Sequence, residues 1–156
     1  MKKVPALLLL FAVASLIGCA GARPPGSSGK FGSALDLLRV REPEMQWDSA
    51  SLLKGDLDQD GTADYALSGL RGNVFVVGIV QGPVSSSSRH WTLKFPMEGG
   101  TDEALCSRKA KIKLEKIEKE GSMARPGVGI NLHDDQCDSF HIFWDPEEGD
   151  YDWWRL

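Results

Sequence analysis

The residues best suited to chemistry lie in an aspartate-rich segment, residues 55–65. Four carboxylates stand there within nine residues, at spacings of two, two and four: Asp56, Asp58, Asp60 and Asp64. Without a counterion these side chains would repel one another, and a hard divalent cation that prefers oxygen ligands removes that penalty. We name residues 56–64 the Asp loop and expect it to bind a metal ion.

Calcium is the ion that the Asp loop suits best. Its first three aspartates can converge from one side of a tight loop, because Gly61 permits a backbone reversal that a β-carbon would hinder. The carbonyl of Thr62 and the carboxylate of Asp64 can then complete the shell. About six flexible oxygen ligands favour calcium over magnesium, which demands near-octahedral geometry and retains its waters. The expected role is structural, since one local loop supplies almost every ligand; a solvated turn without an ion is the alternative.

Short β-rich runs bounded by Gly, Pro, Ser and Asp follow the loop and must position it. The predicted strands cover residues 65–70, 73–81, 90–95, 110–117, 128–132, 139–144 and 151–155. Tight turns at residues 71–73 and 145–150 link the first two and the last two strands. The pattern predicts a mainly β fold, an antiparallel meander.

Two segments are harder to assign. Residues 34–40 contain four large apolar side chains and are short enough to form either a strand or a helical turn, which Pro43 would end. Residues 104–120 hold enough Lys and Glu to suggest a helix. Within them, however, Ile112 and Leu114 alternate with charged residues, which favours an edge strand.

Other aspartate-rich motifs fit the Asp loop less well. An EF-hand shares its first six positions, but Leu67 stands at the twelfth, where that motif needs a bidentate Glu. The flanking segments are also predicted strands, whereas EF-hands are flanked by helices. Dockerin modules come as helical pairs, and this chain has one copy of the motif.

The segment instead resembles an FG-GAP or VCBS repeat, as found in integrin-like β-propeller blades. Six residues match that signature position by position: Gly55, Asp56, Asp58, Asp60, Gly61 and Asp64. A closed propeller needs at least about four blades, and the chain has a single repeat. The resemblance therefore implies a free-standing, blade-like sheet with an Asp-rich calcium loop, extended by the later strands.

The N-terminus has the layout of a secretory signal. Lys2 and Lys3 precede an apolar run, residues 4–17, that is shorter than the roughly 20 residues of a membrane-spanning helix. The run ends in Leu16-Ile17-Gly18-Cys19, which resembles the lipobox of bacterial lipoproteins. That resemblance implies cleavage before Cys19 and acylation of Cys19, whose several chains give stable membrane attachment. An ordinary cleaved signal is the alternative.

The predicted organisation has three parts: a lipoprotein signal peptide at 1–18, a lipidated Cys19 with a flexible tether at 19–33, and a calcium-binding β domain at 34–156. Ala20 follows Cys19 where retained lipoproteins of Gram-negative bacteria carry Asp, so the resemblance implies the outer membrane. The formal net charge of −4 and the absence of a clustered basic segment argue against a nucleic-acid partner.

Three further groups of residues could carry function. Cys106 and Cys137 remain after Cys19 is lipidated, and in an exported domain two thiols most simply form one disulfide; free thiols are the alternative. A zinc site near the second cysteine is disfavoured, because a single strand would spread its potential ligands over about 27 Å: His133, Asp134, Asp135, Cys137 and His141.

The C-terminal hairpin is strongly aromatic. Its side chains could stack on sugars, but core packing is the commoner role for such residues. Adjacent Trp153 and Trp154 must point to opposite faces of a strand. One of them is therefore a candidate for a binding surface.

These observations favour a lipid-anchored cell-envelope protein with one calcium-stabilised β domain, which serves as a binding or structural module and not as an enzyme. Its protein or glycan ligand is not identified by the sequence. Two alternatives stay open. One is a lipoprotein inhibitor of an enzyme such as lysozyme, and the other is an envelope hydrolase that uses the Asp loop for metal-assisted chemistry.

Overall fold

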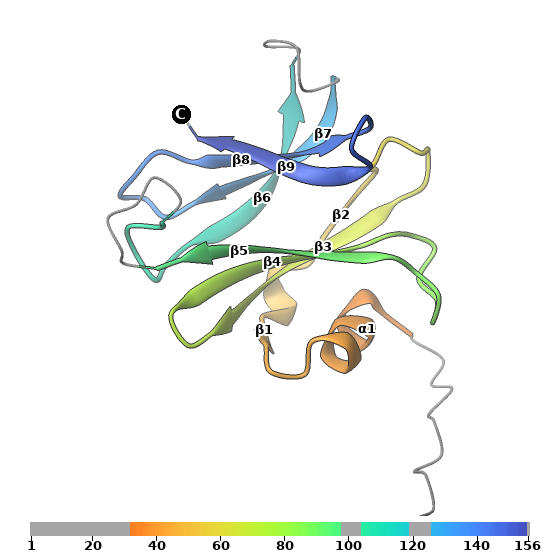
Figure 1. Ribbon diagram of the computed structural model, residues 1–156, viewed down its shortest axis with the longest axis horizontal. Helices are drawn as coiled ribbons and strands as arrows, with labels where there is room; N and C mark the ends of the chain where they lie inside the picture. Colours follow the sequence, from red (N-terminus) through yellow and green to blue (C-terminus); the bar gives the residue numbers. More distant parts are fainter. Residues whose placement is uncertain (1–31, 98–103, 119–125, 156) are drawn as a thin grey trace, which may run out of the picture.

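The computed structural model describes residues 32–97, 104–118 and 126–155, and the strands among them form two antiparallel sheets (Figure 1). The predicted signal, Cys19 and most of the predicted tether lie outside these residues. No helix within the described ranges is long and apolar enough to cross a membrane.

The first sheet contains the Asp loop and the second contains the C-terminal hairpin. The first has the order β1-β3-β4-β5, with β2 also paired to β3: β1 Gln46–Trp47, β2 Leu53–Gly55, β3 Asp64–Arg71, β4 Val74–Val80 and β5 His90–Pro96. The second has the order β6-β7-β8-β9: β6 Lys111–Ile117, β7 Gly127–His133, β8 Phe140–Asp145 and β9 Asp150–Arg155. Every strand pair is antiparallel.

The main hydrophobic core lies between the two sheets. Alternate residues of β4, Phe75, Val77 and Ile79, are buried in it, as period-two patterning requires. The opposite sheet contributes buried side chains from β7 and β8, and the rings of Phe95 and Phe140 meet across the interface with centroids 4.8 Å apart. The domain is thus a β-sandwich.

The helix α1, Ala34–Arg41, covers the other face of the first sheet (Figure 1). Ser33 caps its N-terminus by accepting a hydrogen bond from the backbone N–H of Asp36. Adjacent Leu37 and Leu38 are both fully buried, against a cluster that includes residues of β3 and β4. A strand would point these two leucines to opposite faces, so burying both against one sheet favours the helix over the strand.

The mainly β, antiparallel meander is confirmed, and each of the seven predicted strands is present. β6 is an edge strand paired with β7 alone, as its alternating pattern predicted. The strands divide between two sheets and do not extend one blade-like sheet. The division falls between β5 and β6, and it lets both sheets bury one apolar face against the other.

Candidate metal site

The Asp loop connects β2 to β3. These strands pair in register up to Gly55 and Asp64, so the chain leaves and re-enters the sheet at adjacent positions. Within the loop, Gln59 and Gly61 have positive φ angles of 61° and 89°. Glycine adopts such a conformation without strain, which explains its place at position 61.

Three of the predicted ligands converge. Asp56, Asp58 and Asp64 each offer a carboxylate oxygen, and these oxygens all lie within 4.8 Å of one another. Asp60 lies outside this group and is exposed, with its carboxylate accepting a hydrogen bond from the backbone N–H of Thr62. In the described residues this is the one group of His, Cys, Asp or Glu side chains arranged to hold a metal ion.

Asp64 organises the loop from its base. It is fully buried, and its Oδ2 accepts hydrogen bonds from the backbone N–H groups of Leu57, at 2.9 Å, and Asp58, at 3.1 Å. Its Oδ1 accepts a third from Gly82, at 3.0 Å, just beyond the end of β4. One carboxylate therefore fixes both the start of the loop and its position against the neighbouring strand.

Asp58 is held in a similar way. Its Oδ1 accepts a hydrogen bond from the backbone N–H of Asp60, at 3.1 Å, and its Oδ2 accepts one from the side-chain amide of Gln81, at 2.9 Å. Both donors are uncharged, so they orient the carboxylate without neutralising it. A carboxylate oxygen has two lone pairs, and each of these oxygens keeps capacity for a cation.

The negative charge of the site is poorly compensated. Burial, and next the charge of Asp64, raise the pKa of Asp58 above its ordinary value. Burial also raises the pKa of Asp64, despite its three backbone donors. The Oδ1 atom of Asp56 is buried and has no hydrogen-bond partner in the described part of the chain.

Tyr151 of β9, in the second sheet, is affected by the charges of the Asp loop. Burial, and then the charges of the four loop aspartates, raise the pKa of its phenol well above the ordinary value. Its hydroxyl is buried and without a hydrogen-bond partner among the described residues. Sequence reasoning missed this residue, because Tyr151 is distant in sequence from the loop and no local pattern marks it.

The donor set fits a hard divalent cation. Carboxylate oxygens are the ligands that calcium and magnesium prefer, and no sulfur or imidazole belongs to the group. The three histidines lie elsewhere, with His90 near Glu42, His133 near Asp135 and His141 bonded to Glu115. The arrangement can thus bind an ion through oxygen ligands.

No family model, curated protein or solved structure matches the chain. The likeness of the Asp loop to an FG-GAP repeat therefore stands on the motif residues themselves.

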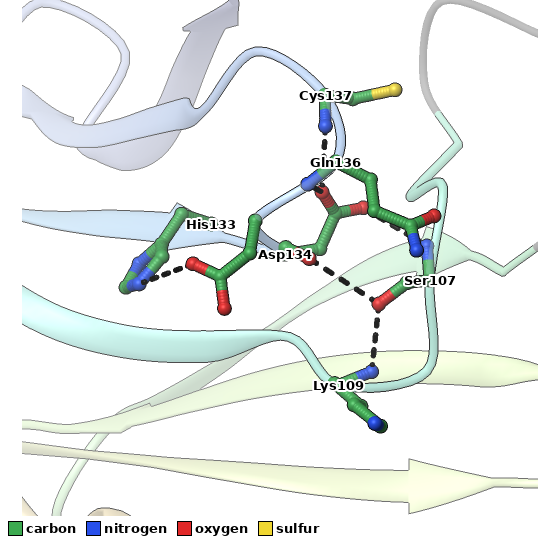
Figure 2. A network of polar contacts seen from close by, with 7 residues as sticks. Ser107, Lys109, His133, Asp134, Gln136 and Cys137 are labelled. Carbon is green, nitrogen blue, oxygen red and sulfur yellow. Dashed lines mark hydrogen bonds and ion pairs between the residues drawn. The ribbon is translucent and has the colours of Figure 1, made fainter.

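The predicted disulfide between Cys106 and Cys137 is present. Beside it lies a carboxylate that sequence reasoning considered only as a disfavoured zinc ligand. The buried side chain of Asp134 accepts hydrogen bonds from four backbone N–H groups, those of Cys106, Ser107, Gln136 and Cys137. Figure 2 shows the network around the turn at residues 134–137.

Asp134 is therefore a structural residue. Burial disfavours its ionised form, but the four backbone donors outweigh burial and lower its pKa. Both cysteine amides are among those donors, so the carboxylate and the disulfide join the same two segments.

The two adjacent tryptophans point to opposite faces, as expected. Trp153 packs into the core, with ring centroids 5.1 Å from Phe140. Trp154 lies on the outer face of the second sheet, where its ring stacks on His141 at 5.3 Å and contacts Phe143. The aromatic hairpin thus packs against the core on one face and forms a small aromatic cluster on the other.

Proposed function

We propose that this chain is a lipid-anchored cell-envelope protein whose β-sandwich binds one calcium ion in the Asp loop and acts as a binding or structural module. The observation that supports ion binding is the convergence of Asp56, Asp58 and Asp64, whose carboxylate oxygens lie within 4.8 Å of one another. The raised pKa values of Asp58 and Asp64 support it, because a divalent cation would offset the repulsion that contributes to them.

The bound ion stabilises the junction of three strands. Asp56 follows β2, Asp64 begins β3, and Gln81 and Gly82 follow β4 and donate to the loop carboxylates. Leu57, between two of the aspartates, is buried in the main core. Calcium binding to the loop therefore stabilises the fold and not a surface segment alone.

Calcium is preferred over magnesium by the number of oxygen ligands in the loop. Besides the three converging carboxylates, Asp60 and the carbonyl of Thr62 are close in sequence and complete the shell once the ion is bound. Calcium accepts six to eight oxygen ligands in flexible geometry, whereas magnesium retains several waters.

The lipid anchor rests on the lipobox sequence that ends at Cys19. Acylation there holds the domain at the membrane through the Pro-, Gly- and Ser-containing tether, residues 20–33, which extends at most about 50 Å. The expected site is the outer membrane, and the partner is a protein or glycan within reach of the tether.

Thermal melting of the full chain in detergent tests the ion. After treatment with a chelator, added calcium should raise the melting temperature, because it binds the native state and not the unfolded one. The double variant Asp56→Ala and Asp60→Ala should lose the shift, while Asp36→Asn, on α1, should keep it. Absence of any calcium-dependent shift in the wild-type chain would refute the ion site.

Metabolic labelling with palmitate tests the anchor separately. The wild-type chain should incorporate label and fractionate with membranes. Cys19→Ser should do neither, and its calcium response should be unchanged. Membrane fractionation of an unlabelled wild-type chain would contradict the lipid anchor without affecting the metal site.

A further inference from the structure

A pocket of about 260 Å³ lies between the two sheets, and none of its lining residues belongs to the Asp loop. Its walls come from the connection between β1 and β2, from β3, and from the start of β6: Asp48, Ala50, Ser51, Ser68, Ala110, Lys111 and Ile112. The pocket is thus bordered by the edge strand of the second sheet and by an irregular edge of the first.

That irregular edge is built by a short 3₁₀ helix, η1 Ser49–Ser51, between β1 and β2. β1 pairs with the end of β3 and β2 pairs with its start, and Ser68 lies between the two paired regions. On this side of β3, the backbone groups of Ser68 form hydrogen bonds to the connection between β1 and β2 and not to a strand. Its N–H donates to the Ser51 hydroxyl at 2.8 Å, and its carbonyl accepts from the N–H of Asp48 at 2.9 Å.

The side chain of Ser68 is left with unused hydrogen-bonding capacity. It lies on the same face of β3 as Ala66, which is a core residue, and only 6% of Ser68 is exposed. Its hydroxyl forms no hydrogen bond to the described residues, and it is open to the solvent of the pocket that the residue lines. Such a hydroxyl can exchange its bound water for a ligand that donates or accepts a hydrogen bond there.

Two opposite charges border the same pocket. Asp48 comes from the first sheet and Lys111 from the second. Asp48 caps η1 by accepting the N–H of Ala50 at 2.9 Å. No ion pair joins Asp48 to Lys111 or involves either of them in the described ranges. Small apolar surfaces, from Ala50, Ala110 and Ile112, complete the lining.

We propose that this pocket binds a small zwitterion, an α-amino acid with a small side chain. Lys111 pairs with the carboxylate of the ligand, Asp48 pairs with its ammonium group, and the Ser68 hydroxyl forms a hydrogen bond to it. The apolar lining accepts the side chain. Both charged residues are exposed, and a zwitterion can pair with both of them at once, whereas a singly charged ligand pairs with only one.

The volume agrees with a ligand of this size. At about 260 Å³ the pocket is slightly smaller than the pockets that bind drug-sized ligands. Pockets for drug-sized ligands run from about 300 to 1,000 Å³. The pocket is therefore large enough for an amino acid and small for a larger metabolite.

Equilibrium dialysis of the full chain in detergent tests the proposal, with radiolabelled glycine, L-alanine and D-alanine as probes at up to about 10 mM. At least one probe should bind saturably. Unlabelled acetate and ethylamine, which carry one charge each, should compete at least about tenfold more weakly than the unlabelled amino acid. A chelator should not change binding, since the pocket is separate from the Asp loop.

Matched variants locate the binding. Lys111→Met and Asp48→Asn should each weaken it at least about tenfold, because each removes one charged partner. Asn caps helices as well as Asp does, so the second variant keeps η1 intact. Lys113→Met, on the same strand but not in the pocket lining, should bind as the wild type does. Far-ultraviolet circular dichroism checks that each variant is folded.

Ser68→Ala should weaken binding less than the two charge variants, because it removes one uncharged hydrogen bond. The proposal is overturned if no probe binds saturably, if acetate or ethylamine competes as well as the amino acid, or if Lys113→Met weakens binding as much as Lys111→Met. None of these results bears on calcium, so the two sites are tested independently.

Discussion

Tyr151 and Asp64 lie in different sheets but share one electrostatic environment. Burial, and then the carboxylate of Asp64, raise the pKa of the Tyr151 phenol well above its ordinary value. Asp64 begins β3 in the first sheet, and Tyr151 belongs to β9 in the second. The charge of the Asp loop therefore acts across the sandwich and, together with burial, keeps this phenol in its neutral form.

Tyr151→Phe should not destabilise the metal-free chain. The hydroxyl that it removes is buried and has no hydrogen-bond partner in the described part of the chain, so its loss should leave the free energy of unfolding unchanged or raise it by up to about 1 kcal/mol. Urea denaturation with a chelator present measures the difference. A loss of more than about 1 kcal/mol would show that the hydroxyl has a stabilising partner.

Single substitutions in the Asp loop should rank in a definite order. Asp56→Asn and Asp58→Asn should weaken calcium binding more than Asp60→Asn, because only the first two belong to the converging group of carboxylates. The expected loss for each of the first two is about tenfold or more. Competition with a fluorescent chelator measures the affinities. Asp60→Asn as the most damaging change would contradict this order.

Asp134→Asn should destabilise the domain by about 1 to 3 kcal/mol, since it weakens charge-assisted hydrogen bonds to four backbone N–H groups. The neighbouring Asp135→Asn is the matched control. Asp135 is exposed and has a positive φ of 62°, a conformation that Asn also tolerates, so stability should be unchanged. Equal losses in the two variants would argue against a special role for Asp134.

The contribution of Asp134 should depend on pH in a defined direction. Its pKa in the folded chain is lowered from the ordinary 3.8, so the unfolded chain binds a proton more readily than the folded one. Its stabilisation is therefore present above 3.8 and is lost as the pH falls through the lower folded pKa. The stability difference between wild type and Asp134→Asn should be constant near neutral pH and shrink in acid. A difference that grows in acid would contradict this.

Loss of the disulfide should reinforce the effect of losing Asp134. Replacing Cys106 and Cys137 by Ser should cost about 3 to 4 kcal/mol, because the disulfide closes a loop with a sequence separation of 31. The Asp134 carboxylate still joins the same two segments in that variant. Adding Asp134→Asn should therefore cost more than the sum of the separate effects, and strict additivity in a double-mutant cycle would show that the two links are independent.

Much of the fold could be predicted because its signals are local. The strands β3 to β9 follow from short β-rich runs, and the edge position of β6 follows from the alternation of Ile112 with charged neighbours. β1, η1 and β2 were not predicted, because segments of two or three residues are too short to show a period. The division into two sheets depends on contacts across the core, which no local pattern records.

The candidate site could likewise be predicted only where its residues are neighbours in sequence. The spacing of the aspartates marked the Asp loop, since its ligands are neighbours in sequence. Tyr151 and the donors of Asp134 could not be predicted, because Cys106 and Ser107 lie 28 and 27 residues from that carboxylate and meet it only in the folded chain. The pocket beside Ser68 likewise exists only once the two sheets pack together.

Isothermal titration calorimetry of the chelator-treated full chain with calcium tests the central claim most directly. We expect a saturable heat with one ion per chain. The double variant Asp56→Ala and Asp58→Ala should abolish this heat, and Asp36→Asn should leave it unchanged. No heat of binding in the wild-type chain, or the same heat in the double variant, would contradict a calcium site in the Asp loop.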